Sequence, residues 1–165
     1  MKATVGIILG TIGILTVLGY PGGPATPPGQ AGSADRPQAT VIHDAAAKAM
    51  LLGSHKFSCQ WISWDYFGTA EVTEENGVMR LKANQRQSDG TDFVELEGFI
   101  TEVHALDFQF QGWIVTQISH INGGQPCRRE RTMTFRISGR RKYWRLKEMD
   151  NPCEEVVDYI DIYFR

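Results

Sequence analysis

The sequence predicts an all-β fold, a single antiparallel meander of about eight strands that closes into an up-and-down barrel with one N-terminal helix. Two observations indicate this class. From Lys56 onward, apolar and polar residues alternate in the period-two pattern of half-buried strands. Short turns join these segments and nothing suggests a crossover helix, so consecutive strands should pair antiparallel. Closure removes the unpaired edges of such a meander, and a two-sheet sandwich is the alternative.

Residues 1–19 have the pattern of a signal peptide or a membrane anchor. Met1 and Lys2 form a minimal positive region, and residues 3–20 are uncharged and mostly apolar. The run contains several glycines and threonines and is short for a bilayer span, which needs about 20 apolar residues, so cleavage is favoured over retention. Both alternatives imply export to the periplasm or the cell exterior, either as a free protein or held to the membrane by residues 3–20.

Residues 20–39 hold most of the prolines of the chain together with several glycines. That composition cannot bury a core and predicts a disordered linker in front of a β-barrel domain at residues 40–165. The domain should begin with a helix over residues 41–52, because this run is rich in alanine. Thr40 can cap the start of this helix, and Gly53 stands at its expected end.

The strands follow from the alternation and from the turn residues between them. Asn76-Gly77 predicts a tight hairpin turn, where positive φ is needed. Gly98 and Gly112 each interrupt a long strand pattern, which predicts bends where the sheet curls. In order, the strands are expected at residues 57–62, 66–73, 78–83, 93–103, 108–115, 131–137, 142–149 and 156–164.

The three cysteines divide into a predicted pair and a single residue. In an antiparallel meander, the connections before the strands at 131–137 and 156–164 lie at the same end of the sheet. We therefore expect a disulfide between Cys127 and Cys153, which export would permit, with two separate thiols as the alternative. Cys59 is expected to be a small buried residue on a strand rather than a nucleophile.

The general plan resembles the lipocalin and calycin group of small β-barrels. The shared features are an exported chain, an N-terminal helix, an early tryptophan at Trp61, a meander of eight strands and basic residues near the last strands. The first-strand Gly-x-Trp of that family is not matched, since Ser58-Cys59-Gln60 precede Trp61. The resemblance implies the shape of the barrel, and no ligand-contact residue is transferred from it.

Two sets of residues could bind a partner. A barrel of eight strands is just wide enough to be filled by side chains or to hold one small ligand. A small apolar ligand would be lined by some of the large aromatic residues, Phe93, Phe99, Phe110, Trp113, Phe135 and Trp144. The second set lies in the basic stretch at residues 128–147. If the apolar residues of its strands point into the core, the residues that alternate with them point outward, namely Arg136, Tyr143, Arg145 and Lys147.

This basic face could bind an anionic component of the cell envelope, such as a phosphorylated glycan or a lipid head group. The alternative is that the cations are satisfied within the sheet, because Asp161 on the next strand can pair with them. The carboxylates that alternate along strands could place an acid and a base inside the barrel, but a row that faces solvent is the expectation for Glu95, Glu97, Asp158 and Asp161.

No catalytic, metal or cofactor site is expected. The histidines are scattered with no metal-ligand spacing, and the chain has no phosphate-binding glycine loop, nucleophile elbow or Cys-x-x-Cys. A net charge of −2 and the export signal argue against nucleic acid as a partner. The sequence therefore favours a non-enzymatic exported binding module for a small apolar ligand over an envelope interaction protein that uses its basic outer face.

Overall fold

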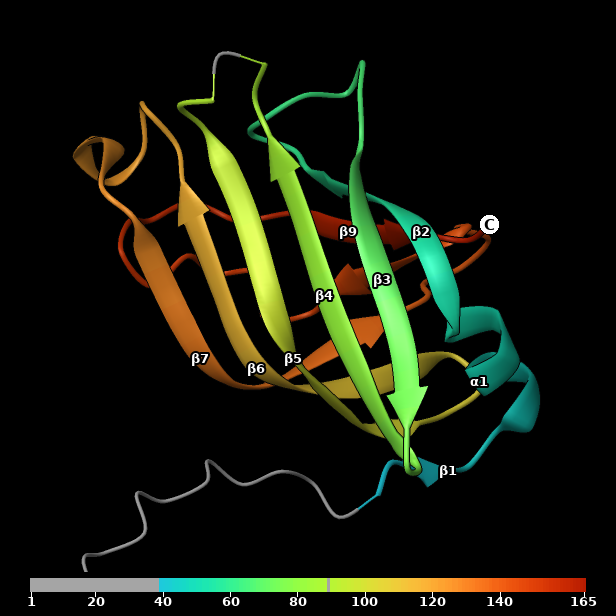
Figure 1. The fold of residues 1–165 in the computed structure, drawn as a ribbon. Helices are drawn as coiled ribbons and strands as arrows, with labels where there is room; N and C mark the ends of the chain where they lie inside the picture. The colour runs from blue at the N-terminus through green and yellow to red at the C-terminus, as the bar shows by residue number, and fades with distance from the viewer. Residues whose placement is uncertain (1–38, 89) are drawn as a thin grey trace, which may run out of the picture. The chain divides into compact units, whose positions relative to one another are not determined.

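The fold is a closed antiparallel barrel of eight strands (Figure 1). The computed structural model describes residues 39–88 and 90–165, so the predicted signal peptide or anchor and nearly all of the predicted linker lie outside the described residues. The barrel strands are β2 (Gly53–Cys59), β3 (Gly68–Glu75), β4 (Val78–Arg86), β5 (Phe93–Val103), β6 (Asp107–Gln117), β7 (Cys127–Arg136), β8 (Tyr143–Leu146) and β9 (Ile160–Tyr163).

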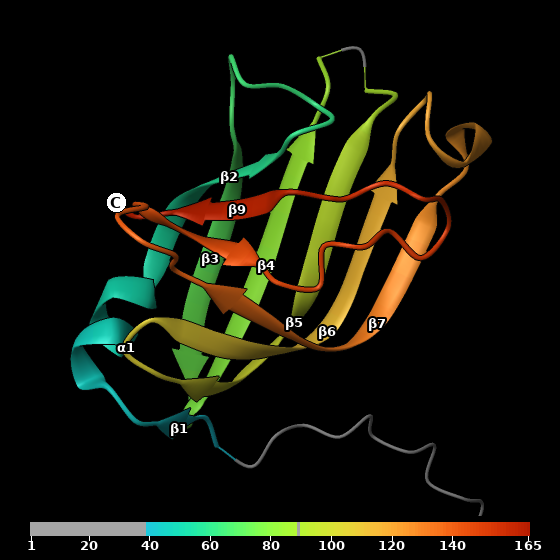
Figure 2. The same ribbon diagram turned by 180° about the vertical axis from the view of Figure 1, so that it is seen from behind.

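Each barrel strand pairs with the next one along the chain, and β9 pairs with β2 to close the ring (Figure 2). The predicted up-and-down barrel is confirmed. The Asn76-Gly77 turn between β3 and β4 has positive φ at both residues, 52° and 76°, as the hairpin requires. In residues 39–88 and 90–165, no helix has the length and apolar character needed to cross a membrane.

The segment before β2 differs from the helix expected over residues 41–52. Val41–Ile42 forms a short strand, β1, which pairs in parallel with β5, and helix α1 covers only Ala45–Leu51. Thr40 does not cap the helix, because its hydroxyl donates to a backbone carbonyl of β5 at 2.6 Å and accepts from a backbone amide of β4 at 2.8 Å. Asp44 caps α1 instead, accepting a backbone N–H of the first turn at 2.7 Å.

The last three strands have different bounds from those predicted. β7 begins earlier, at Cys127, whereas β8 and β9 are shorter and are joined by a long loop at residues 147–159. Within this loop only Asp150 and Val157 form an isolated bridge. A disulfide between Cys127 and Cys153 ties the loop to the start of β7, with Cα atoms 6.0 Å apart. The predicted disulfide is therefore confirmed.

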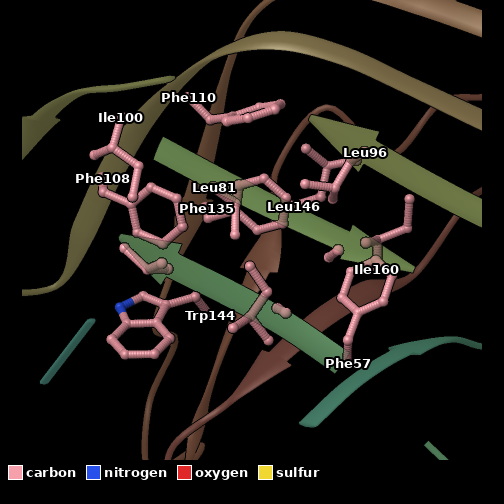
Figure 3. Packing of buried hydrophobic residues seen from close by; sticks show 14 of the residues in the cluster. Phe57, Leu81, Leu96, Ile100, Phe108, Phe110, Phe135, Trp144, Leu146 and Ile160 are labelled. Carbon is pink, nitrogen blue, oxygen red and sulfur yellow. The ribbon is translucent and has the colours of Figure 1, made fainter. Parts of the chain in front are cut away.

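Side chains fill the interior of the barrel (Figure 3). The largest buried residues come from strands all round the ring, and many have no exposed surface. A side chain with no exposed surface touches no space wide enough for a water molecule, so these residues do not line a ligand cavity. Those with 0% exposure include Phe57, Leu81, Ile100, Phe108, Phe110, Met133, Phe135, Leu146, Ile160 and Ile162.

Strands β5 and β6 curve strongly along their length (Figure 1), and Gly98 of β5 lies directly opposite Gly112 of β6. A Cβ added at Gly98 would lie 2.3 Å from the carbonyl oxygen of Gln111 and 2.6 Å from the Cα of Gly112. The backbones of the two strands are therefore so close at this point that only glycine fits. The ring of Phe110 covers both glycines, and its atoms would lie 2.8 and 2.7 Å from the two added Cβ atoms.

Candidate functional site

Three of the six aromatic residues expected around a ligand lie inside the barrel and fill it. Phe110 and Phe135 have no exposed surface and Trp144 is 1% exposed. The ring of Phe135 stacks on Phe108 with centres 5.2 Å apart, and Phe110 meets Phe135 edge to face at 6.0 Å. Trp144 contacts the ring of Phe164 at 4.6 Å. These side chains pack against one another, as close-packed interiors do.

The other three, Phe93, Phe99 and Trp113, lie on the outer face, which corrects their expected place in the interior. The fully buried residues of β5 near Phe93 and Phe99 are even-numbered, so these two phenylalanines point the other way. Trp113 precedes the buried Ile114 in β6 and also points outward. Each ring has a guanidinium above it, in the pairs Arg86 over Phe93 at 4.5 Å, Arg80 over Phe99 at 6.0 Å and Arg128 over Trp113 at 4.8 Å.

Phe99 and Trp113 flank a hollow on the outer side of the bend. The two glycines lie opposite each other in β5 and β6, and both line the hollow together with the residues that follow them, Phe99 and Trp113. We call this hollow the corner groove, and its volume is about 580 Å³. Its walls come from β4 to β7, and its lining residues are Arg80, Glu97, Gly98, Phe99, Gln111, Gly112, Trp113, Glu130, Arg131 and Thr132.

The charges that line the corner groove balance. Arg80 and Arg131 are its cations, and Glu97 and Glu130 are its carboxylates. Glu97 forms an ion pair with Arg80, and among the described residues no ion pair includes Arg131. An amide from β6 and a hydroxyl from β7 add further polar groups. The groove thus offers both hydrogen-bond donors and acceptors between two aromatic rings, without a net charge.

Most of the predicted cations of the basic face form ion pairs with carboxylates on neighbouring strands. All four residues predicted for it lie on the outer side of the barrel, Arg136, Tyr143, Arg145 and Lys147. The two carboxylate oxygens of Asp161 accept from Nε and Nη2 of Arg145, each at 2.7 Å, and this pairing raises the pKa of Arg145 above its ordinary value. Arg136 lies 3.6 Å from the carboxylate of Asp107. Pairing between strands therefore occupies two of the three predicted cations.

Lys147 is the remaining cation of this face, and no described residue forms an ion pair with it. Together with Arg141 and Arg145 it lines a small hollow of about 150 Å³ beside Tyr159. The other lining residues are Ser138 and Met149, so no carboxylate lines this space. This hollow, which we call the basic hollow, is the part of the predicted surface that an anion could still use.

A buried ion pair that the sequence did not indicate holds the loop between β8 and β9. Arg129, 5% exposed, is paired with the carboxylate of Asp158, which has no exposed surface. Arg129 also donates to the carbonyl of Glu148 at 3.0 Å, while Trp61 and Asn151 donate to Asp158 at 3.0 and 3.1 Å. Asp158 was expected to face solvent, and that expectation is wrong. The burial of Arg129 could have been predicted from its place in the alternating pattern of β7. The buried residues of this strand all have odd numbers, and Arg129 is one of them.

Cys59 has no exposed surface, as expected for a small core residue. Burial raises the pKa of its thiol from 9.0 to about 12. The thiolate is the reactive form of cysteine, so this residue is unsuited to nucleophilic chemistry at neutral pH.

Comparison with known proteins identifies the family. Residues 39–164 match the family model described as the PM1083 family, so the chain belongs to the PM1083 family. A relative in Pasteurella multocida (strain Pm70), the uncharacterized protein PM1083, is 49% identical over 114 residues, which span 69% of this chain and 73% of that protein. No solved structure matches the chain. The likeness to lipocalins is accordingly one of barrel shape.

Proposed function

We propose that this member of the PM1083 family is an exported binding module that holds its ligand in the corner groove, on the outside of the barrel. The observation that carries the proposal is the combination of a packed interior with a ligand-sized hollow on the outer surface. Ligand sites are usually concave, with apolar walls, a few polar groups and volumes of about 300–1,000 Å³. The groove, at about 580 Å³, fits this description, whereas the interior leaves no space beside its fully buried aromatic residues for a small apolar ligand.

The lining of the groove favours a neutral carbohydrate chain. A sugar ring has an apolar face that can stack on an aromatic side chain, and Phe99 and Trp113 supply two such partners. Its hydroxyl groups both donate and accept, which suits the guanidinium, carboxylate and amide groups between the two rings. The balanced charges of Arg80, Arg131, Glu97 and Glu130 give no preference for an anionic or a cationic ligand.

The compartment is part of the proposal. The disulfide between Cys127 and Cys153 supports export, because such bonds persist in oxidising compartments such as the periplasm. An exported protein encounters the glycans of the cell envelope. We propose binding without catalysis, since the two carboxylates that line the groove, Glu97 and Glu130, are each paired with an arginine and the groove has no histidine or cysteine among its lining residues.

Calorimetric titration with tetra-N-acetylchitotetraose, a neutral oligosaccharide, tests this function. We expect one binding site per chain, and at least tenfold weaker binding, about 1.4 kcal/mol, in Trp113→Ala and Phe99→Ala. The matched control is Phe93→Ala, because Phe93 is also an outer aromatic of β5 beneath an arginine but does not line the groove. Binding that is unaffected by the two groove variants, or reduced equally by the control, would contradict the proposal.

The basic hollow supports a second candidate, binding of an anionic envelope component. Its specific support is that Arg141 and Lys147 line a space that no carboxylate lines. Inorganic phosphate serves as the probe. If this site is used, phosphate will shift the NMR signals of residues 138–149, and Lys147→Gln will abolish the shift, whereas Arg136→Gln, outside the hollow, will not.

A further inference from the structure

Three metal-ligating side chains from two distant segments, His43, Glu102 and His104, meet where β1 pairs with β5. Glu102 is in β5 and His104 follows it two positions later, so both side chains point to the same face of the strand. β1 pairs in parallel with β5 in the register Val41 with Glu102 and Ile42 with Val103. The backbone N–H of His43 also donates to the carbonyl of Val103 at 2.9 Å. The parallel pairing therefore places His43 beside His104.

The ligand atoms of this cluster are already close together. One carboxylate oxygen of Glu102 lies 3.1 Å from Nε2 of His104 and 3.6 Å from Nε2 of His43. The two imidazole rings stack with centres 4.2 Å apart and planes 6° apart. One ligand atom from each of the three residues lies within 4.8 Å of the others.

We propose that His43, Glu102 and His104 bind one divalent transition-metal ion, with zinc as the best-suited class. Zinc takes imidazole nitrogen and carboxylate oxygen at about 2.0–2.2 Å, so two ligand atoms of a tetrahedral site lie roughly 3.4 Å apart. The separations of 3.1 and 3.6 Å bracket this value. Water would complete the coordination, since three protein ligands leave one tetrahedral position open.

The side chains can adjust to the ion at little cost. All three are about half exposed, with side-chain exposures of 48% for His43, 46% for Glu102 and 39% for His104. A turn of each imidazole about its side-chain torsions would direct a ring nitrogen at a common point, while the backbone is held by the pairing of β1 with β5.

Metal binding here would act as a clamp on the N-terminal strand. β1 has only two residues, and its strand pairing is confined to β5. An ion shared by His43 on one side and by Glu102 and His104 on the other would cross-link the two strands and stabilise the folded state by linkage. The site shares none of the lining residues of the corner groove, so the two proposals are tested by different variants.

The test is titration of the full chain, without a polyhistidine tag, with Zn²⁺ alone, followed by calorimetry. We expect one ion per chain and at least tenfold weaker binding in each of His43→Ala, Glu102→Gln and His104→Ala. The matched control is His120→Ala, because His120 is an exposed histidine whose ring contacts Trp61 and which lies outside the cluster. Circular dichroism of each variant checks that the barrel is intact.

Two further measurements sharpen the test. Saturating Zn²⁺ should raise the Tm of the wild type and of His120→Ala but not that of the three cluster variants, and it should slow hydrogen exchange of the His43 amide. Absence of stoichiometric binding to the wild type would overturn the proposal. So would zinc binding that persists unchanged in His43→Ala and His104→Ala, since the cluster would then be only a surface ion pair beneath two stacked rings.

Discussion

Replacing Arg129 with methionine should destabilise the barrel more than any other change to the basic stretch. The guanidinium is 5% exposed, pairs with the fully buried Asp158 and donates to the backbone carbonyls of Glu148 and Asp150. Methionine keeps an unbranched apolar stem but carries no charge and no N–H donor, so Arg129→Met leaves a buried carboxylate without its cation and two carbonyls without their donor. The loop between β8 and β9 depends on these contacts.

The size of the effect follows from the burial of both partners. Removing one member of a buried ion pair costs about 3–5 kcal/mol, because the other charge stays buried and uncompensated. A domain of this size loses roughly 3–5 °C of Tm per kcal/mol, so the expected fall is on the order of 10–20 °C. Adding Asp158→Asn removes the uncompensated charge, and the double variant should therefore be more stable than Arg129→Met alone.

Thermal unfolding followed by circular dichroism measures this effect. The matched control is Arg128→Met, one position away, where the guanidinium is exposed and its partner Glu130 is exposed as well. Surface pairs of this kind contribute about 0–1 kcal/mol, so the control should unfold close to the wild type. A Tm for Arg129→Met within the range of the control would refute the reasoning.

Three further changes have expected outcomes. Replacing Cys127 and Cys153 by alanine opens a loop with a sequence separation of 26 and should lower the free energy of unfolding by about 3.5 kcal/mol in urea titrations; an unchanged midpoint would argue against the bond. The thiol of Cys59 should resist iodoacetamide at pH 8 until the protein is unfolded, since its pKa is about 12. Because the unfolded thiol ionises near 9.0 and the folded one near 12, stability should fall by about 1.4 kcal/mol per pH unit between these values, and Cys59→Ala should lack that decline. Gly98→Ala would place a Cβ 2.3 Å from a backbone oxygen and should cost about 1–3 kcal/mol; full wild-type stability would show that the bend is not required.

The barrel could be predicted because its signals are local and repeated. Alternating residues and short turns indicate a meander, which closes into a barrel. In a meander the connections before alternate strands lie at the same end of the sheet, which places Cys127 beside Cys153. The outward orientation of Phe93 and Phe99 could also have been predicted from the sequence. Both lie an even number of positions from Glu95 and Glu97, so all four side chains point to the same face of the strand. Carboxylates on a strand indicate that this face is the outer one.

The remaining features depend on contacts between distant residues. β1 is too short to alternate, so nothing local predicts that His43 will lie beside His104. The local sequence around Thr40 predicts a helix cap, but its hydroxyl forms hydrogen bonds with the backbone of two barrel strands instead. The lining of the corner groove comes from four strands, and the register that brings Gly98 and Gly112 together could not be read from either strand alone.

Where the ligand binds is the central question, and the indole signals of the tryptophans answer it most directly. Trp113 lines the corner groove, and Trp144 is buried in the interior. Titration with tetra-N-acetylchitotetraose in ¹⁵N-labelled protein should shift the Nε1 signal of Trp113 and leave that of Trp144 in place. A shift of the Trp144 signal with no change at Trp113 would put the ligand inside the barrel and contradict an outer binding site.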